Sequence, residues 1–338
     1  MRFADTKWAR VMGEVWPAAQ GHVAAELNLP DPATVAFAGN THDFLIRIVS
    51  AHPRRPLRVL ASDGEFHSFR RQAARWAEAE TIRLEVVPAS GADFADRFLA
   101  RARSGDHDLI WVSQVMFGSG RVLTGLDRLA ELARPEGPWV VVDGYHGFMA
   151  IETDLSQVSD RLFYLAGGYK YAMAGEGAAF LHAPPNYGGR PEITGWYAQI
   201  ADLAARPGRI EYPADARRFL GSTFDPSGLY RFVAVRDMLG TEKLDTRKIG
   251  ARTSELMNHL LDQIAGTRLA DAKLLNPPGE GPQARFLAFA HPRVPDWQAA
   301  LERANAIVDV RGDVLRIGFG LYQDESDVDR LIGLLRHL

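Results

Sequence analysis

The 338-residue sequence contains no cysteine. Disulfide bridges, thiolate metal sites and cysteine nucleophiles are therefore excluded together. The chain does not depend on an oxidising compartment for its folding. We predict no metal site from the remaining residues.

Long apolar runs and blocks of like charge are also missing. No run approaches the roughly 20 apolar residues that a membrane helix needs, and residues 1–20 lack the apolar core of a secretory signal. The net charge is −3 and the pI is near 6.4, with no basic cluster, which argues against a nucleic-acid partner. We expect a soluble, cytoplasmic protein that binds neither membranes nor nucleic acid.

What the sequence does contain is a regular alternation of short apolar segments and helical segments. The apolar fraction is 46%, enough for a large core. Apolar segments of 4–7 residues recur, among them LRVLAS, IRLEVVP, HDLIWVSQV, WVVVDG and RLFYLAGG. Buried strands separated by helices are typical of a mainly parallel α/β sheet covered by helices on both faces.

The length of the chain suits two domains of ordinary size. We predict an N-terminal helical segment over residues 1–28, a large α/β domain over 29–240, and a smaller α+β domain over 241–338. The last section combines strands such as RFLAFAHP and VLRIGFG with helices around DWQAALERA and DESDVDRLIGLLRHL, which indicates an α+β domain.

The residues that follow the predicted strands are polar or aromatic. In open parallel sheets, ligands bind outside the carboxyl ends of the strands, so these residues should converge on one crevice. They offer a helix N-terminus, an aromatic ring, a carboxylate, an imidazole and an amine. The residues in question are Asn40, Thr41, Phe66, Ser68, Ser113, Gln114, Asp143, His146, Tyr169 and Lys170.

This combination suits pyridoxal 5′-phosphate (PLP). A helix N-terminus binds a phosphate, an aromatic ring stacks on a flat heterocycle, and a buried carboxylate stabilises a protonated pyridine nitrogen. A lysine forms a Schiff base with the aldehyde, and Lys170 is the candidate. Each feature alone has an ordinary explanation, since Asn40 could simply cap a helix and Lys170 could be a solvated turn residue. The coincidence of all five favours the cofactor.

Several segments together resemble a known family. VVVDGYHG, GGYKYAMAGEGAAFLH, EFHSF, TGWYAQ and VDVRGDVLRIGFGLYQDESDV resemble segments of class V, fold-type-I PLP enzymes, and most closely those of kynureninases. The resemblance covers residues 33–338. It implies a PLP-dependent transferase fold, a small-molecule amino-acid substrate and a homodimer with a shared active site.

The resemblance also implies roles for individual residues. Asp143 would pair with the pyridine nitrogen, His146 would lie beside the cofactor, and Lys170 would carry it. The phosphate and ring would be bound by Asn40, Thr41, Phe66, Ser68 and Tyr169, and in the partner subunit by Trp196 and Thr223. Arg316 would pair with the substrate α-carboxylate through its guanidinium fork.

The sequence departs from the family pattern where substrate and partner contacts would lie. The Phe-Pro-Ser-Asp loop of kynureninases is replaced by residues 66–69, Phe-His-Ser-Phe, and the Gly-Trp-Trp-Gly-His stretch by residues 195–199, Gly-Trp-Tyr-Ala-Gln. Gln114 cannot stack on the cofactor as the histidine of some class V enzymes does. The absence of cysteine excludes a cysteine desulfurase of the usual kind.

These residues predict an enzyme that abstracts the Cα proton of an amino acid through a Schiff base on Lys170. A kynureninase-like hydrolase or lyase, cleaving a Cβ–Cγ or Cβ–X bond, is the leading expectation. A class V aminotransferase is the first alternative. The second alternative is a non-catalytic protein that keeps the fold and acts by binding.

Overall fold

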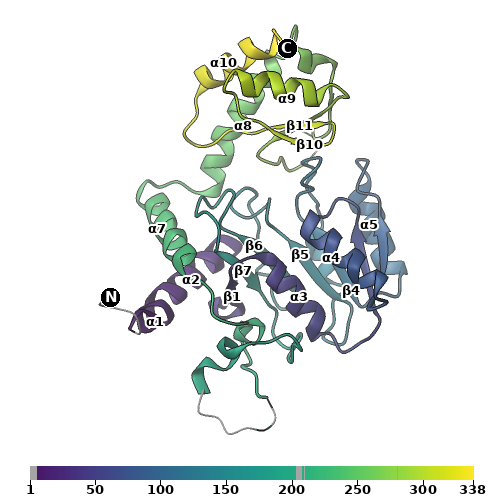
Figure 1. Ribbon diagram of the computed structural model, residues 1–338, viewed down its shortest axis with the longest axis vertical. Helices are drawn as coiled ribbons and strands as arrows, with labels where there is room; N and C mark the ends of the chain where they lie inside the picture. Colours follow the sequence, from purple (N-terminus) through teal and green to yellow (C-terminus); the bar gives the residue numbers. More distant parts are fainter. Residues whose placement is uncertain (1–5, 203–207, 209, 280) are drawn as a thin grey trace. The chain divides into compact units, whose positions relative to one another are not determined.

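A computed structural model describes residues 6–202, 208, 210–279 and 281–338 (Figure 1). The chain forms two compact units. The first unit comprises residues 1–114 and 123–242, and the second comprises residues 115–122 and 243–338. The second unit thus takes in a short excursion from the middle of the chain. The division predicted above, at residues 28 and 240, stays a prediction.

The first unit is built on a mixed sheet of seven strands in the order β1-β7-β6-β5-β4-β2-β3. β2 to β6 run parallel, whereas β7 is antiparallel to both of its neighbours, β6 and β1. β1 therefore points the same way as β6. The strands are β1 (Val35–Ala38), β2 (Leu57–Ser62), β3 (Ile82–Val87), β4 (Leu109–Ser113), β5 (Trp139–Asp143), β6 (Leu162–Gly167) and β7 (Ala179–His182).

Helices connect the first five strands in chain order, as the alternation in the sequence predicts, and one more helix follows β7. They are α3 (Thr41–Ala51), α4 (His67–Glu78), α5 (Phe94–Ser104), α6 (Leu126–Ala130) and α7 (Ser227–Thr241), with short 3-10 turns at η2 (Pro32–Thr34), η3 (Trp196–Asp202) and η4 (Ala216–Phe219). The central strands β4 and β6 are buried along their whole length. Burial on both faces explains why these strands read as continuous apolar runs. The predicted fold class is confirmed.

The N-terminal segment is helical from residue 7 to residue 27. It consists of α1 (Lys7–Arg10), a π-helical turn η1 (Val11–Val15) and α2 (Trp16–Leu27). Trp16 is buried and packs edge-on against Phe37 of β1, with ring centroids 4.9 Å apart. The apolar positions of this helix thus cover the β1 end of the sheet.

The second unit has its own four-stranded antiparallel sheet and its own core. The strand order is β10-β11-β9-β8, with β8 (Lys273–Leu274), β9 (Leu287–Ala290), β10 (Asp309–Arg311) and β11 (Val314–Ile317). The helices are α8 (Thr246–Asp262), α9 (Val294–Arg303) and α10 (Glu325–Leu335), with a 3-10 turn at η5 (Arg268–Asp271). Buried side chains of α8, α9, α10 and the sheet form one apolar cluster, which includes Leu256, Phe289, Trp297, Leu315 and Ile332.

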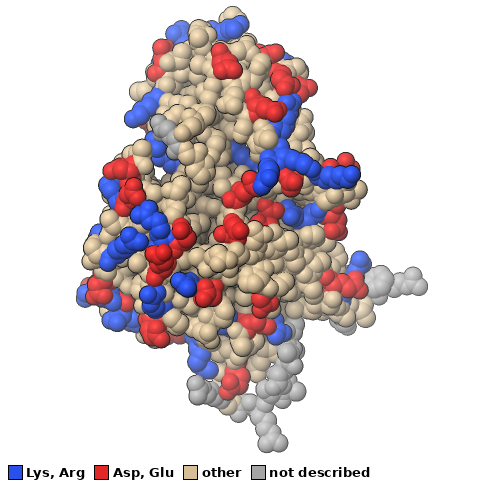
Figure 2. Space-filling model, turned by 180° about the vertical axis from the view of Figure 1, so that it is seen from behind, with Lys and Arg blue, Asp and Glu red and all other residues tan. Residues whose placement is uncertain are grey.

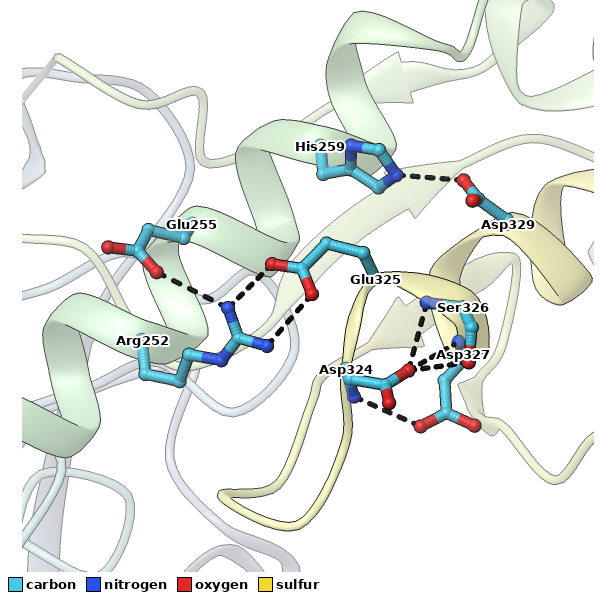
Figure 3. A network of polar contacts seen from close by, with 8 residues as sticks. All are labelled: Arg252, Glu255, His259, Asp324, Glu325, Ser326, Asp327 and Asp329. Carbon is cyan, nitrogen blue, oxygen red and sulfur yellow. Dashed lines mark hydrogen bonds and ion pairs between the residues drawn. The ribbon is translucent and has the colours of Figure 1, made fainter.

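Polar contacts join α8 to α10 on the surface of this unit (Figure 3). Arg252 donates to both carboxylate oxygens of Glu325, at 2.6 and 3.1 Å. About two turns further along α8, His259 Nε2 lies 2.8 Å from Asp329 Oδ1. Asp324 is the N-cap of α10 and forms a capping box with Asp327. The Asp324 side chain accepts the Asp327 N–H, and the Asp327 side chain accepts the Asp324 N–H.

Acidic and basic side chains are interspersed over the face shown in Figure 2. In the described part of the chain, no helix combines the length and the apolar character needed to span a bilayer. The same residues contain no cluster of three or more acidic, histidine or cysteine side chains arranged to hold a metal ion.

Candidate active site

Five loops that follow strands of the first unit begin at the same edge of its sheet. They follow β1, β2, β4, β5 and β6, whose strand directions agree. The sequence-predicted residues of the first unit on these loops therefore come to one edge, although β7 separates β1 from β6. This is the edge at which an open α/β sheet binds its ligand.

Lys170 and His146 are in direct contact at this edge. Lys170 follows β6 and His146 follows β5, and these two strands are parallel neighbours. Lys170 Nζ lies 2.8 Å from His146 Nε2 and 5.7 Å from the centre of the Tyr145 ring. His146 is 8% exposed. An amine and an imidazole at this distance form a hydrogen bond, and a positive charge on one disfavours a positive charge on the other.

Asp143 ends β5, three residues before His146. Its Oδ1 accepts a 3.0 Å hydrogen bond from the Tyr145 backbone N–H. Burial raises the pKa of the Asp143 carboxyl to about 6, against the opposing effects of that hydrogen bond and of the Lys170 charge. Among the described residues no cationic side chain forms an ion pair with Asp143, so its charge is stabilised only in part.

A helix N-terminus contributes the third feature. Asn40 caps α3, and its side chain accepts the Asp43 N–H at 3.0 Å. This N-cap follows from the residue type, because Asn is among the best N-caps. Thr41 is the first helical residue, and a Cβ placed on Gly39 would meet no atom within 4 Å. The α3 terminus is therefore open to a phosphate group.

Aromatic side chains at the edge are unusually exposed. Phe66 and Tyr169 are 40% and 55% exposed, although large apolar rings are normally covered. Ser68, in the first turn of α4, is exposed and lines a hollow of about 1190 Å³ over α4 and the end of β2. The Phe66 ring is thus available to cover a flat ligand.

Trp196 and Thr223, which the resemblance assigns to a subsite shared with a partner, lie together. Trp196 Nε1 donates to Thr223 Oγ1 at 2.9 Å, and both side chains are exposed. The Trp196 ring stacks on Tyr197, with centroids 4.3 Å apart. Their role towards a partner subunit stays a prediction.

Arg316 belongs to the second unit, where it lies on β11. Its Nε donates to Asp309 Oδ2 at 2.5 Å, its Nη1 donates to the Phe117 carbonyl at 2.6 Å, and its guanidinium lies 5.1 Å from the Phe286 ring centre. The side chain is 10% exposed. Asp309 and Phe117 thus hold the guanidinium in place, and its binding of a substrate carboxylate stays a prediction.

Three features of the site were missed by the sequence analysis. Tyr145 lies beside Lys170. Burial raises the pKa of the Tyr145 hydroxyl to about 12. Tyr164 of β6 donates to Gln114 at 2.7 Å, which fixes the amide that was considered only as a poor stacking group. Glu65 is fully buried below the Phe66 loop. The one sequence signal for the burial of Glu65 is the serine that ends each of two strands, in LRVLAS and LIWVS, because both serines donate to its carboxyl.

The sequence model of the family called Aminotransferase class-V matches residues 12–331. The chain belongs to the class-V aminotransferase family. This family is PLP-dependent, which confirms the predicted cofactor and family, and makes this protein a class-V PLP-dependent enzyme. The likeness to kynureninases in particular stays an expectation.

A relative and two solved structures illustrate this membership. Isopenicillin N epimerase of Streptomyces clavuligerus is 30% identical over 335 residues, which cover 90% of this chain and 80% of the epimerase. A cysteine desulfurase of Thermococcus onnurineus NA1 matches with a TM-score of 0.76 and 16% identity, over 97% of this chain and 84% of that chain. The cystine C-S lyase C-DES, solved with its product cysteine persulfide, matches with a TM-score of 0.78 and 17% identity. The match covers 99% of this chain and 89% of the lyase chain.

The residues present fit PLP. The family cofactor needs an amine, a carboxyl for its ring nitrogen and donors for its phosphate, and Lys170, Asp143 and the α3 terminus supply these at one edge. The incompletely stabilised charge of Asp143 is the observation that decides the fit, because a protonated ring nitrogen would provide the missing cation.

Proposed function

We propose that this protein abstracts the Cα proton of a small-molecule amino acid, with PLP held on Lys170. The contact between the Lys170 amine and the His146 imidazole, 2.8 Å apart beside a buried carboxyl, carries the proposal. When bound, PLP supplies an aldehyde for covalent attachment and an electron sink for the charge left on Cα.

The residues at the sheet edge would divide the binding of the cofactor among them. Asp143 would hold the ring nitrogen in its protonated form, and Phe66 would cover one face of the ring. Asn40 and Thr41, with Ser68 and Tyr169, would bind the phosphate through the N-terminus of α3 and nearby hydroxyl groups.

Lys170 and His146 would act as a proton-transfer pair. A lysine acts as a base only when its amine is neutral. His146 Nε2, at hydrogen-bonding distance, can accept and hold the proton that Lys170 must lose. The low exposure of His146 keeps bulk water from exchanging with that proton freely.

The fate of Cα defines the reaction class. We favour return of a proton to Cα, an epimerisation or racemisation, because the relative that is 30% identical is named an epimerase. Kynureninase-like cleavage of a Cβ–Cγ or Cβ–X bond is the second candidate, on the likeness of the segment 308–328 to kynureninases. A transaminase would instead need a 2-oxo acid acceptor, and a non-catalytic protein would exchange no proton.

Two parts of the proposal concern substrate and assembly. Arg316 would pair with the substrate α-carboxylate, which would compete with Asp309 and the Phe117 carbonyl for the guanidinium N–H groups. Trp196 and Thr223 would complete the phosphate site of a partner subunit, so the functional unit would be a homodimer sharing its active sites.

Deuterium exchange tests the proposal. The PLP-loaded protein is incubated with single amino acids in D₂O, and each is analysed by mass and by chiral chromatography. We expect a substrate to gain one deuteron and, in an epimerase, to lose its optical purity. Lys170→Ala should abolish both, whereas Lys248→Ala, which removes an exposed lysine of α8, should abolish neither. Release of alanine or pyruvate would favour cleavage instead.

The proposal is wrong if no amino acid exchanges its Cα proton although PLP is bound to Lys170. In that case the non-catalytic alternative would describe the protein better.

A further inference from the structure

Glu65 is a buried acid that the proposed chemistry does not use. It lies between β2 and α4 and has no exposed surface. Its Oε1 accepts the Ser62 hydroxyl at 2.5 Å and its Oε2 accepts the Ser113 hydroxyl at 2.6 Å. Ser62 ends β2 and Ser113 ends β4, which are neighbouring strands. The carboxyl thus spans the ends of two strands at the active-site edge.

Asp143 lies beside this group. Ser113 of β4 is the register partner of Asp143 on β5, so one serine contacts Glu65 from the strand position opposite Asp143. Burial raises the pKa of Glu65 to about 7, the two serine hydroxyls oppose the rise, and the charge of Asp143 adds to it. The charge that acts on Asp143 in turn comes from Lys170. Asp143 thus acts on Glu65, and because a Coulomb interaction is mutual, a charge on Glu65 also acts on Asp143.

A buried carboxyl that only held the two serines in place would carry an unnecessary desolvation cost. An amide in the same place could accept from one serine and donate to the other, with no buried charge. Two hydroxyls that donate to both oxygens instead favour the ionised carboxylate, against the burial that raises its pKa. Glu65 also precedes Phe66, the N-cap of α4, so it fixes the loop that presents the ring.

We propose that Glu65 is a positioning residue of the PLP site: its carboxylate stands behind Asp143 and strengthens the negative field that keeps the cofactor ring nitrogen protonated. Glu65 acts through Asp143 and does not touch the cofactor itself. The proposal rests on the proposed function, because it assumes that Asp143 faces the ring nitrogen.

Glu65→Gln separates charge from shape, since glutamine fills the same space and keeps hydrogen bonds to both serines. The apoprotein is titrated with PLP by tryptophan fluorescence, and the visible absorbance of the loaded protein is then followed against pH. We expect the Kd for PLP to rise about tenfold and the absorbance midpoint to fall by about one pH unit, as loss of a nearby negative charge requires. Glu26→Gln is the matched control, a carboxyl with an 11% exposed side chain that pairs with Arg236, and should change neither quantity.

A second variant covers the case in which Glu65→Gln fails to fold. Ser113→Ala removes one donor to Glu65, disfavours its charge and should shift the midpoint in the same direction. Unchanged Kd and midpoint in a folded Glu65→Gln, or in Ser113→Ala if the first does not fold, would overturn the role of Glu65 alone. Failure of the wild-type protein to bind PLP on Lys170 would overturn the proposed function together with this inference.

Discussion

Replacing Asp143 by asparagine should stabilise the apoprotein at neutral pH. The asparagine Oδ1 can still accept the Tyr145 N–H, so the change removes the charge and keeps the shape. The pKa of Asp143 in the folded protein is about 6, against an ordinary value of 3.8. At about 1.4 kcal/mol for each pKa unit, burial of the charge costs the folded apoprotein up to roughly 3 kcal/mol.

The direction of the Asp143 pKa shift determines the pH range over which the two proteins differ in stability. Because the folded-state pKa is raised, the protonated carboxyl contributes stability below pH 3.8, and that contribution is lost as the pH rises through about 6. The free energy of unfolding of Asp143→Asn minus that of the wild type should therefore increase between about pH 4 and pH 7. The increase should reach roughly 3 kcal/mol.

Urea denaturation of the apoproteins at several pH values measures this difference. Asp31→Asn is the matched control, because Asp31 accepts the N–H of Ala33 in the same local geometry but is exposed. It should show no comparable increase over the same window. A difference between Asp143→Asn and wild type that stays constant from pH 4 to pH 7 would refute the argument, since the Asp143 charge would then carry no burial cost. With PLP bound, the advantage of asparagine should disappear.

Three further predictions concern other parts of the molecule. Gly144→Ala should lower the free energy of unfolding by roughly 1–3 kcal/mol in chemical denaturation, because a Cβ there would lie 2.0 Å from the ring of Tyr164; a loss below 0.5 kcal/mol would contradict the packing. Arg316→Lys should raise KM for the amino acid about tenfold with kcat little changed, because the guanidinium fork is lost; an unchanged KM would remove Arg316 from the substrate site. Arg252→Ala should lower the Tm by no more than about 2 °C, since its pair with Glu325 is exposed (Figure 3); a larger fall that persists in high salt would show that the pair is structural.

Most of the first unit could be predicted because its strands are buried on both faces. Such strands are long apolar runs, and LRVLAS and WVVVD identify β2 and β5 directly. The helices followed from the 3.6-residue period and from caps such as Asn40. The order and direction of the strands then placed Asp143, His146 and Lys170 at one edge, as the rule for parallel sheets requires.

Features that depend on distant partners could not be predicted in this way. β7 is as apolar as its neighbours, and nothing in its sequence marks it as antiparallel. The excursion of residues 115–122 joins the second unit through backbone carbonyls, which accept from Asn276 and Arg316. Carbonyl groups carry no sequence signal. β8, with two residues, is too short for any period to show.

The same reason explains why Glu65 was missed. A lone glutamate in a Gly-Glu-Phe loop is usually solvated, and its burial depends on two serines that are 51 positions apart. Only the pairing of β2 with β4 brings those serines together.

Covalent trapping of PLP tests the central claim most directly. The purified protein is mixed with PLP, its visible spectrum is recorded, and the mixture is reduced with borohydride and mapped by peptide mass spectrometry. We predict a yellow protein and a phosphopyridoxyl group on the peptide that contains Lys170. A colourless protein, or a label spread over exposed lysines with none on Lys170, would contradict the assignment of this site.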